Sequence, residues 1–262
     1  MLQNTARPRR HVCVIDKKFN MDKPMPRPPF LWLLVTWFSS MSTCFAQEAW
    51  QFKLTPSYYK TAQEISATDV NLRANKDMHA LWIGQYDQFN VFHQTRVGYE
   101  YTLRTDWGQI IPSIQSATGG FWGSSLNVQW GQSTYLIGGL GRTNVRPYYN
   151  LNFDPNDAIT VGLGTWLSAE HQWTLWRTQD DRLQTGQQVT HLMWRYHMPS
   201  GNRLTLDTSV KKGRSDPISE VVKGRSLTAT WDWSQYFVRF AWDQKVNFSN
   251  DDQTRMSLGW HF

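Results

Sequence analysis

Alternation of apolar and polar side chains with a period of two runs through most of the chain, and it restricts the possible folds more than any other feature. In residues 254–262, Met256, Leu258, Trp260 and Phe262 share one face of an extended segment, and polar residues or glycine share the other. Successive side chains of a β-strand point to opposite faces, so the pattern predicts a chain built largely of strands. It recurs in residues 97–103, 126–130, 159–163, 203–210, 226–233 and 236–245.

One apolar run, residues 30–38, departs from this alternation and marks a separate N-terminal segment. Seven Lys and Arg residues precede it, and Cys44-Phe45-Ala46 ends the segment that follows it. This order is typical of an export signal, so we expect cleavage after Ala46. A membrane-spanning helix needs about 20 apolar residues, roughly twice the length of this run. We therefore predict an N-terminal extension with a cleaved signal peptide over residues 1–46, with Met21 or Met25 as alternative starts, and a second domain over residues 47–262.

Separating the two segments changes what the composition implies. Residues 1–46 hold seven of the 27 Lys and Arg residues but two of the 21 Asp and Glu residues, so residues 47–262 are nearly neutral. The basic pI of the whole chain is therefore no indication of nucleic-acid binding. Both cysteines, Cys13 and Cys44, precede residue 47, which excludes a disulfide from the second domain. Lipid attachment at Cys44 is a minor alternative.

Tryptophan placement favours a membrane barrel over a soluble sandwich or a lipocalin-like barrel, which alternation alone does not separate. Residues 47–262 contain 13 of the 15 tryptophans. Trp122 and Trp130 lie eight residues apart on one face, and Trp50 and Tyr58 repeat this spacing. Eight residues of a tilted strand rise about 20 Å, close to the roughly 25 Å apolar band between two aromatic girdles. We therefore expect the aromatic face to contact lipid.

Connection lengths, followed backwards from the last strand, support this architecture. Long connections at residues 247–253, 211–222 and 179–187 alternate with tight turns at 234–235 and 199–202, which is typical of transmembrane barrels. Nearer the N-terminus, short connections at 105–106 and 131–132 are expected on the side of the long loops. We predict an all-β, antiparallel up-and-down β-barrel of 12 to 14 strands. Fifteen segments fit the pattern, and we attribute the odd number to a misassigned segment between residues 48 and 87.

The last strand carries a resemblance to a known class of proteins. Residues 254–262, TRMSLGWHF, resemble the C-terminal signature strand of Gram-negative outer-membrane β-barrels, with a terminal aromatic residue and apolar residues two, four and six positions before it. The resemblance implies location in the outer membrane of a Gram-negative bacterium and recognition by the barrel-assembly machinery. It indicates no specific family. The implied insertion signal consists of Met256, Leu258, Trp260 and Phe262.

If the aromatic face meets lipid, the opposite face encloses a polar interior. The aromatic residues expected to face lipid are Trp122, Trp130, Trp231, Trp233, Trp242 and Trp260. The residues expected to line the lumen are Arg195, Arg203, Asp207, Asp232, Arg239, Asp243, Arg255, His191 and His197. These charges either pair across strands and partly plug the lumen or line a polar channel. An uncharged wall is expected from Ser113, Gln115, Ser125, Asn127 and Gln129.

Such an interior favours a passive or substrate-biased pore for small polar solutes, with outer-membrane lipid and lipopolysaccharide as further partners. One alternative is a lipid-modifying enzyme that uses Ser and His, although the six histidines of residues 47–262 lie in no G-x-S-x-G or H-E-x-x-H motif. Another is a structural or surface-interaction barrel with a plugged lumen. We expect no cofactor, no metal and no catalytic residue.

Two further segments have more than one interpretation. Residues 142–157 are rich in Asn and Asp around Asp154, Asn156 and Asp157, a composition that favours plain turns over a calcium or surface-ligand site. Glycines gather at residues 138–141 and 162–164. Their lack of side chains either forms a recess in the wall or permits the curvature that closes a barrel.

Overall fold

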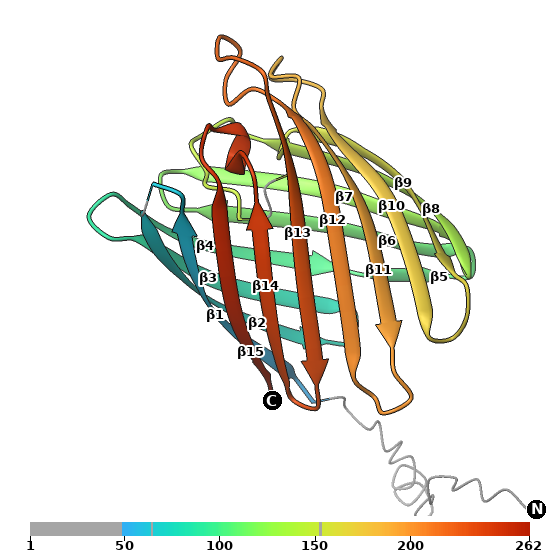
Figure 1. Ribbon diagram of the computed structural model, residues 1–262. Coiled ribbons are helices and arrows are strands. Elements are labelled where there is room, and N and C mark those ends of the chain that lie inside the picture. The colour runs from blue at the N-terminus through green and yellow to red at the C-terminus, as the bar shows by residue number, and fades with distance from the viewer. Residues whose placement is uncertain (1–48, 64, 152–153) are drawn as a thin grey trace, which may run out of the picture. The chain divides into compact units, whose positions relative to one another are not determined.

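The structure is a computed structural model that describes residues 49–63, 65–151 and 154–262, so the predicted signal peptide lies outside the described residues. These residues form strands and one 3-10 turn, η1 (Val246–Phe248) (Figure 1). No helix among them is long and apolar enough to cross a membrane. The strands are β1 (Gln51–Thr61), β2 (Ser66–Lys76), β3 (His79–Gln88), β4 (Phe92–Tyr101), β5 (Leu103–Thr105), β6 (Gly108–Ala117), β7 (Phe121–Gly131), β8 (Thr134–Thr143), β9 (Ala158–Trp166), β10 (His171–Asp180), β11 (Gln188–His197), β12 (Arg203–Gly213), β13 (Val222–Trp233), β14 (Tyr236–Asp243) and β15 (Gln253–His261).

The strands form one closed antiparallel sheet. Neighbours in sequence pair along the sheet, and β1 pairs with β15 to close the ring (Figure 1). At this junction the backbone groups of Phe52 and Phe262 bond in both directions, with N···O distances of 2.8 and 3.0 Å. Closure leaves no exposed sheet edge, which is the condition for a β-sheet to be stable in hydrocarbon. The predicted up-and-down barrel is confirmed.

The barrel wall has fourteen strands, at the upper end of the predicted range, because β5 continues β4. Both pair with β6 in one register, in which Glu100 lies opposite Ser113 and Leu103 lies opposite Ile110. Between these pairs β6 carries Pro112, which has no N–H to donate, so the ladder is interrupted there. The attribution of the odd strand count to residues 48–87 is therefore wrong, since that region holds the regular strands β1, β2 and β3.

All the long loops lie at one end of the barrel, and the connections at the other end are short. The long loops span residues 144–157, 181–187, 214–221 and 244–252. The short turns at 106–107 and 132–133 lie at the other end and are joined by a backbone hydrogen bond from Gly131 N to Trp107 O (2.8 Å). The expectation that residues 105–106 and 131–132 lie on the long-loop side is thus wrong. The described residues between β8 and β9, 144–151 and 154–157, contain no strand, so the chain reverses only once between these two strands.

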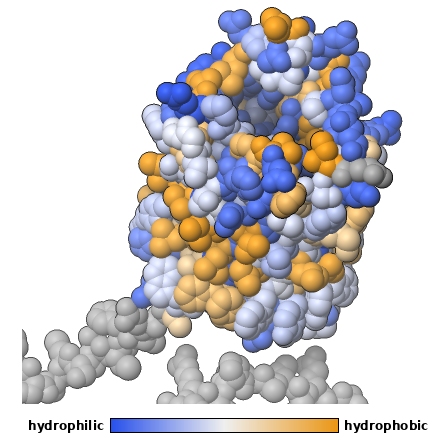
Figure 2. Space-filling model, turned by 90° about the vertical axis from the view of Figure 1, so that its left-hand side faces the viewer, coloured by the Kyte–Doolittle hydropathy of each residue, from blue (hydrophilic) through white to orange (hydrophobic). Residues whose placement is uncertain are grey.

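Apolar side chains cover the outside of the wall. Ile114, Val161, Met256 and Leu258 are each more than half exposed, and they belong to strands spread around the barrel. On one side of the molecule, Figure 2 shows hydrophobic residues spread over the lower wall and strongly hydrophilic residues mainly near the upper rim. The arrangement inverts that of a soluble protein, and it is the one expected of a barrel surrounded by hydrocarbon.

Candidate functional site

The inner faces of the strands enclose a polar cavity of about 530 Å³. Its lining contains six Lys and Arg side chains and three Asp and Glu side chains, so cationic groups outnumber acidic ones. Hydroxyl and amide groups complete it, among them Ser113, Gln115, Ser125 and Asn127 from β6 and β7. Arg239 and Arg255 belong to this lining. The space is large enough for a small molecule and offers both donors and acceptors of hydrogen bonds.

Residues 144–157, here called the inner loop, leave the wall between β8 and β9 and reach strands far around the barrel. Gln94 on β4 holds the backbone of Tyr149 at both its N–H (3.0 Å) and its carbonyl (3.2 Å). On β15, Gln253 donates to the Tyr149 hydroxyl and Arg255 donates to the carbonyl of Leu151, each at 3.2 Å. Because β4 and β15 lie on either side of β1–β3, the loop crosses the interior and narrows it.

Aromatic packing holds the inner loop in place. The ring of Tyr149 stacks on that of Tyr86 with centroids 4.7 Å apart, and Tyr86 packs edge-on against Tyr59. These tyrosines form a buried cluster with Leu151 inside the barrel. The ring of Tyr148 stacks on that of Phe121 with centroids 4.1 Å apart, and burial raises the pKa of the Tyr148 hydroxyl. The loop is therefore a packed element and not a loose segment.

His191 links the inner loop to the opposite wall. Its Nδ1 lies 3.0 Å from Asp207 on β12, and its Nε2 lies 3.1 Å from Asp154 of the loop. The imidazole lies flat against the Trp176 ring, with centroids 4.4 Å apart. Both nitrogens face carboxylates, and both can donate only when the ring carries its second proton. The arrangement therefore joins two acidic groups through one cation.

Several of the residues expected in the lumen form ion pairs. Arg203 bonds Asp232 on the adjacent strand at 3.1 Å, as expected if the charges pair across strands. Asp243 instead pairs at 2.6 Å with Lys211, which was not among the residues expected in the lumen. The alternation alone places Lys211 on the same face as Asp207, and this signal was sufficient to find it.

Two further ion pairs, which were not expected from the sequence, cross β3. Arg96 on β4 bonds Asp69 on β2 at 2.7 Å, with both side chains buried, and Arg73 pairs with Glu100 over the same strand. The guanidinium of Arg96 passes over Gly84, where a Cβ would press against it. Both pairs lie in strands for which no inward-facing charges were expected.

The remaining predicted lumen residues lie toward the short-turn half of β11. Arg195 donates to the Gln172 side chain at 3.0 Å, and the His197 ring lies 5.4 Å from that of Trp166. The nine residues thus form several separate sets of contacts within the interior and do not converge on one centre.

Aromatic residues also occur inside the barrel, where the sequence pattern predicts polar side chains. Four of them lie directly opposite a glycine on the next strand, and a Cβ on that glycine would meet the ring or, at Trp176, the start of the side chain. Because the glycine has no side chain, the aromatic residue can lie against the wall. The four pairs are Trp82 with Gly98, Tyr135 with Gly164, Trp176 with Gly162, and Phe237 with Gly259.

Most of the glycines singled out in the sequence therefore permit close contacts with a neighbouring strand or loop. Gly162 and Gly164 accommodate Trp176 and Tyr135, and Gly141 lies under the backbone of Asn156 in the inner loop. Gly138 has open space where a side chain would be.

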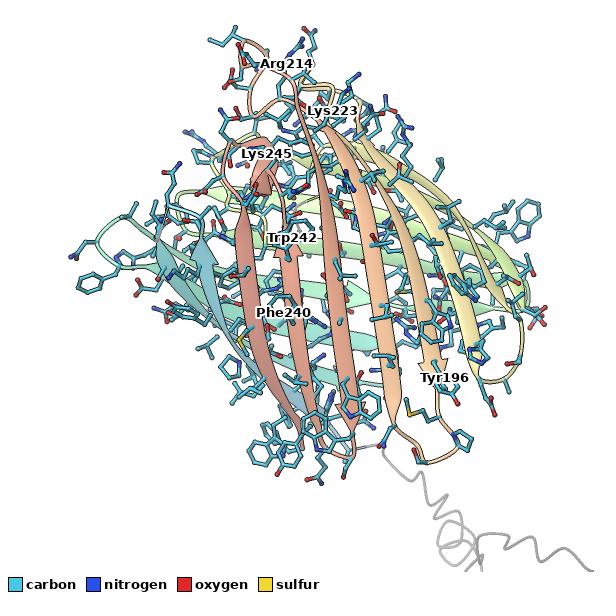
Figure 3. All side chains as sticks on the ribbon, viewed as in Figure 1. Tyr196, Arg214, Lys223, Phe240, Trp242 and Lys245 are labelled. Carbon is cyan, nitrogen blue, oxygen red and sulfur yellow. The ribbon has the colours of Figure 1, made fainter. Side chains whose placement is uncertain are left out.

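The tryptophans expected to face lipid lie on the outer surface. Trp122, Trp130, Trp231, Trp233 and Trp260 are exposed, and Trp242 is half-buried. In Figure 3 Trp242 and Phe240 lie on β14, and Tyr196 lies near the lower end of β11. All four residues of the expected insertion signal are exposed on β15 or just after it.

The Asn- and Asp-rich segment has a structural role. Asp154 bonds His191, whereas Asp157 accepts from the Thr143 N–H (3.0 Å) and pairs with Arg182 (2.5 Å). No three His, Cys, Asp or Glu side chains of the described residues come together as a metal-binding group. The segment is neither a plain turn nor an isolated surface patch, because it forms the inner loop.

No family model and no curated protein matches this chain. Solved structures resemble its fold. The Acinetobacter baumannii outer membrane protein Omp33 aligns with 81% of this chain and 98% of its own, with a TM-score of 0.55 and 9% sequence identity. The KdgM porin aligns with 80% of this chain and 99% of its own (TM-score 0.46, 9% identity). A triple mutant of Rhodopseudomonas blastica porin aligns with 82% of this chain and 99% of its own (TM-score 0.48, 9% identity). The likeness to Omp33 confirms the fold, a closed antiparallel β-barrel like that of this outer membrane protein.

Proposed function

We propose that this protein is a passive pore in the outer membrane of a Gram-negative bacterium and passes small polar solutes. The observation that carries the proposal is the polar cavity of about 530 Å³ inside a closed barrel with an apolar outer wall. Water and polar solutes are stable in such a cavity, while the outer wall matches hydrocarbon. The inner loop sets the size limit, since it crosses the interior between Gln94 and Gln253.

Conductance of the folded protein in planar lipid bilayers tests this proposal. We expect the native protein to conduct, and a variant with residues 146–155 replaced by a short Gly-Ser turn to conduct several-fold more, because the obstruction is removed. A matched control shortens the loop at residues 214–221, which connects β12 and β13 at the rim. Absence of conductance from folded native protein would refute the pore, and equal effects of the two deletions would refute the role of the inner loop.

Placement in the membrane is part of the proposal. The exposed aromatic residues near both ends of β7 fit the two interfaces of a bilayer, and the apolar residues between them fit its core. The leader at residues 1–46 would direct export, and β15 with Phe262 would be read by the barrel-assembly machinery. Deletion of Phe262 should reduce the amount of folded protein in the outer membrane. A substitution of Gln235, which lies in a short turn, should not reduce the amount of folded protein.

The lipid partner is proposed to include the phosphates of lipopolysaccharide. Lys212 and Lys223 lie directly opposite each other on β12 and β13, and Arg225 lies on the same outward face, all exposed. Figure 3 shows Lys223 near the upper rim. Like charges in facing positions are destabilising unless an anion binds between them. Phosphorylated lipid A should raise the thermal stability of the native protein more than dephosphorylated lipid A, and Lys212→Gln with Lys223→Gln should abolish the difference.

A further inference from the structure

We infer that the pore selects small anions, such as carboxylates and phosphates, through a basic strip formed by Lys53 on β1, Arg239 on β14 and Arg255 on β15. This inference rests on the proposed pore function and names its class of solute. All three side chains line the same cavity. They come from three consecutive strands of the closed sheet, since β1 pairs with β15 and β15 pairs with β14.

Phe237 brings two of these cations together. Lys53 Nζ lies 4.3 Å from the centroid of its ring, and Arg239 Cζ lies 5.5 Å from it, so the two charges are within about 10 Å of each other. The ring itself is 1% exposed and lies over Gly259. The Phe237 ring thus contacts two positive charges at about the same height in the lumen.

Arg255 extends the strip toward the inner loop. It lies opposite Ala241 in the β14–β15 ladder, which makes it the diagonal neighbour of Arg239 on the same face. Its Cζ lies 5.7 Å from the Tyr59 ring, and its Nη1 donates to the Leu151 carbonyl of the inner loop. A solute that passes the loop therefore meets Arg255 first and the other two cations next.

The acidic groups of the cavity are already engaged elsewhere. Asp69 bonds Arg96, Glu100 bonds Arg73, and Asp154 bonds His191. In the described part of the chain, Lys53 forms no ion pair or side-chain hydrogen bond, and Arg239 forms a single side-chain hydrogen bond, to Thr230 (3.0 Å). The positive charges of Lys53 and Arg239 are therefore left to act on the cavity.

The wall facing the strip contributes no opposing charge. β7 lies half-way around the fourteen-stranded ring from β14, and it presents Ser125 and Asn127 to the cavity. Ser125 also bonds Ser113 on β6 at 2.8 Å. Hydroxyl and amide groups can solvate an anion without competing for the cations. Charges of one sign in a narrow cavity raise the local concentration of the opposite ion, which produces selectivity.

Reversal potentials across bilayers with a KCl gradient test the inference. We expect the native pore to prefer chloride to potassium at 0.1 M salt, where the Debye length is about 10 Å, and the preference to fall at 1 M, where it is about 3 Å. Citrate added to one side should interrupt the chloride current, a test that requires no variant. Lys53→Glu and Arg239→Glu should each reduce the preference, and the double variant should reverse it. Lys60→Glu, an equal charge change at an exposed position of β1, should leave it unchanged.

Each outcome is decisive. A native pore that conducts but prefers cations, or strip variants that match native selectivity, would overturn the inference and leave the pore proposal standing. A folded native protein that does not conduct would refute both the pore proposal and the inference of anion selectivity. Lys53→Gln and Arg239→Gln, which keep most of the side-chain volume, provide the same comparison if the Glu variants fold poorly, with a smaller expected reduction.

Discussion

Lys211 on β12 reaches across β13 to Asp243 on β14, and its Nζ lies 2.6 Å from the carboxylate. Both side chains are almost fully buried inside the barrel, at 1% and 5% exposure. The residue opposite Lys211 on β13 is Gly224, which has no side chain to obstruct the crossing. The contact therefore joins three strands.

Removing one member of this pair should destabilise the barrel far more than removing both. We expect Asp243→Asn to lower the free energy of unfolding by about 3–5 kcal/mol, because it removes the carboxylate that pairs with a buried ammonium group. The double variant Lys211→Met, Asp243→Leu should lower the free energy of unfolding much less. Urea unfolding in lipid vesicles, followed by tryptophan fluorescence, measures both. A double variant at least as unstable as Asp243→Asn would contradict this account.

The tether between His191 and Asp154 should restrict movement of the inner loop. His191→Phe keeps an aromatic ring on Trp176 but removes the hydrogen bonds to Asp154 and Asp207. The loop remains bound at Gln94, so we expect more frequent fluctuations of single-channel current with only a modest rise in mean conductance. Asp181→Asn is the control, since Asp181 pairs with Arg142 and not with the inner loop. Native-like current noise in His191→Phe would argue against the tether.

The contact between Phe237 and Gly259 provides a test of how the interior aromatic residues are accommodated. A side chain at Gly259 would occupy the position of the Phe237 ring, so Gly259→Val should lower stability by about 1–3 kcal/mol and weaken anion preference. Gly138→Val is a matched control, because open space surrounds the added side chain. If the two substitutions have equal effects on stability, the close packing at Gly259 is not important.

The strands were predictable because the sequence of each strand shows the period-two pattern by itself. Period two places Arg239 and Arg255 on one face and Phe240 and Met256 on the other without knowledge of any neighbour. The fold class and the approximate strand number follow from this local pattern. The split between β4 and β5 does not, since it arises where Pro112 faces a neighbouring strand.

The inner loop was not predictable, because its partners lie far away in the sequence. Tyr149 depends on Gln94 and Gln253, which are 55 and 104 residues distant, while the local run of Asn and Asp resembles an ordinary turn. The interior aromatics were missed for a similar reason. Whether Trp176 faces lipid or lumen depends on Gly162 in the adjacent strand, and the register that joins them is visible only in the folded barrel.

The outer face of β9 provides the most direct test of which surface meets lipid. Val161 lies near the middle of this strand and is 58% exposed, while its neighbour Thr160 lines the cavity. An arginine at the bilayer midplane of such a barrel costs about 2–4 kcal/mol, so Val161→Arg should lower the free energy of unfolding in lipid vesicles by that amount. Thr160→Arg should lower the free energy of unfolding by about 1 kcal/mol, chiefly because it removes the hydrogen bond to Thr178. In detergent micelles the difference between the two variants should shrink, because a micelle deforms around a charge more readily than a bilayer does. An equal loss for the two variants in vesicles would mean that the exposed apolar wall does not contact hydrocarbon.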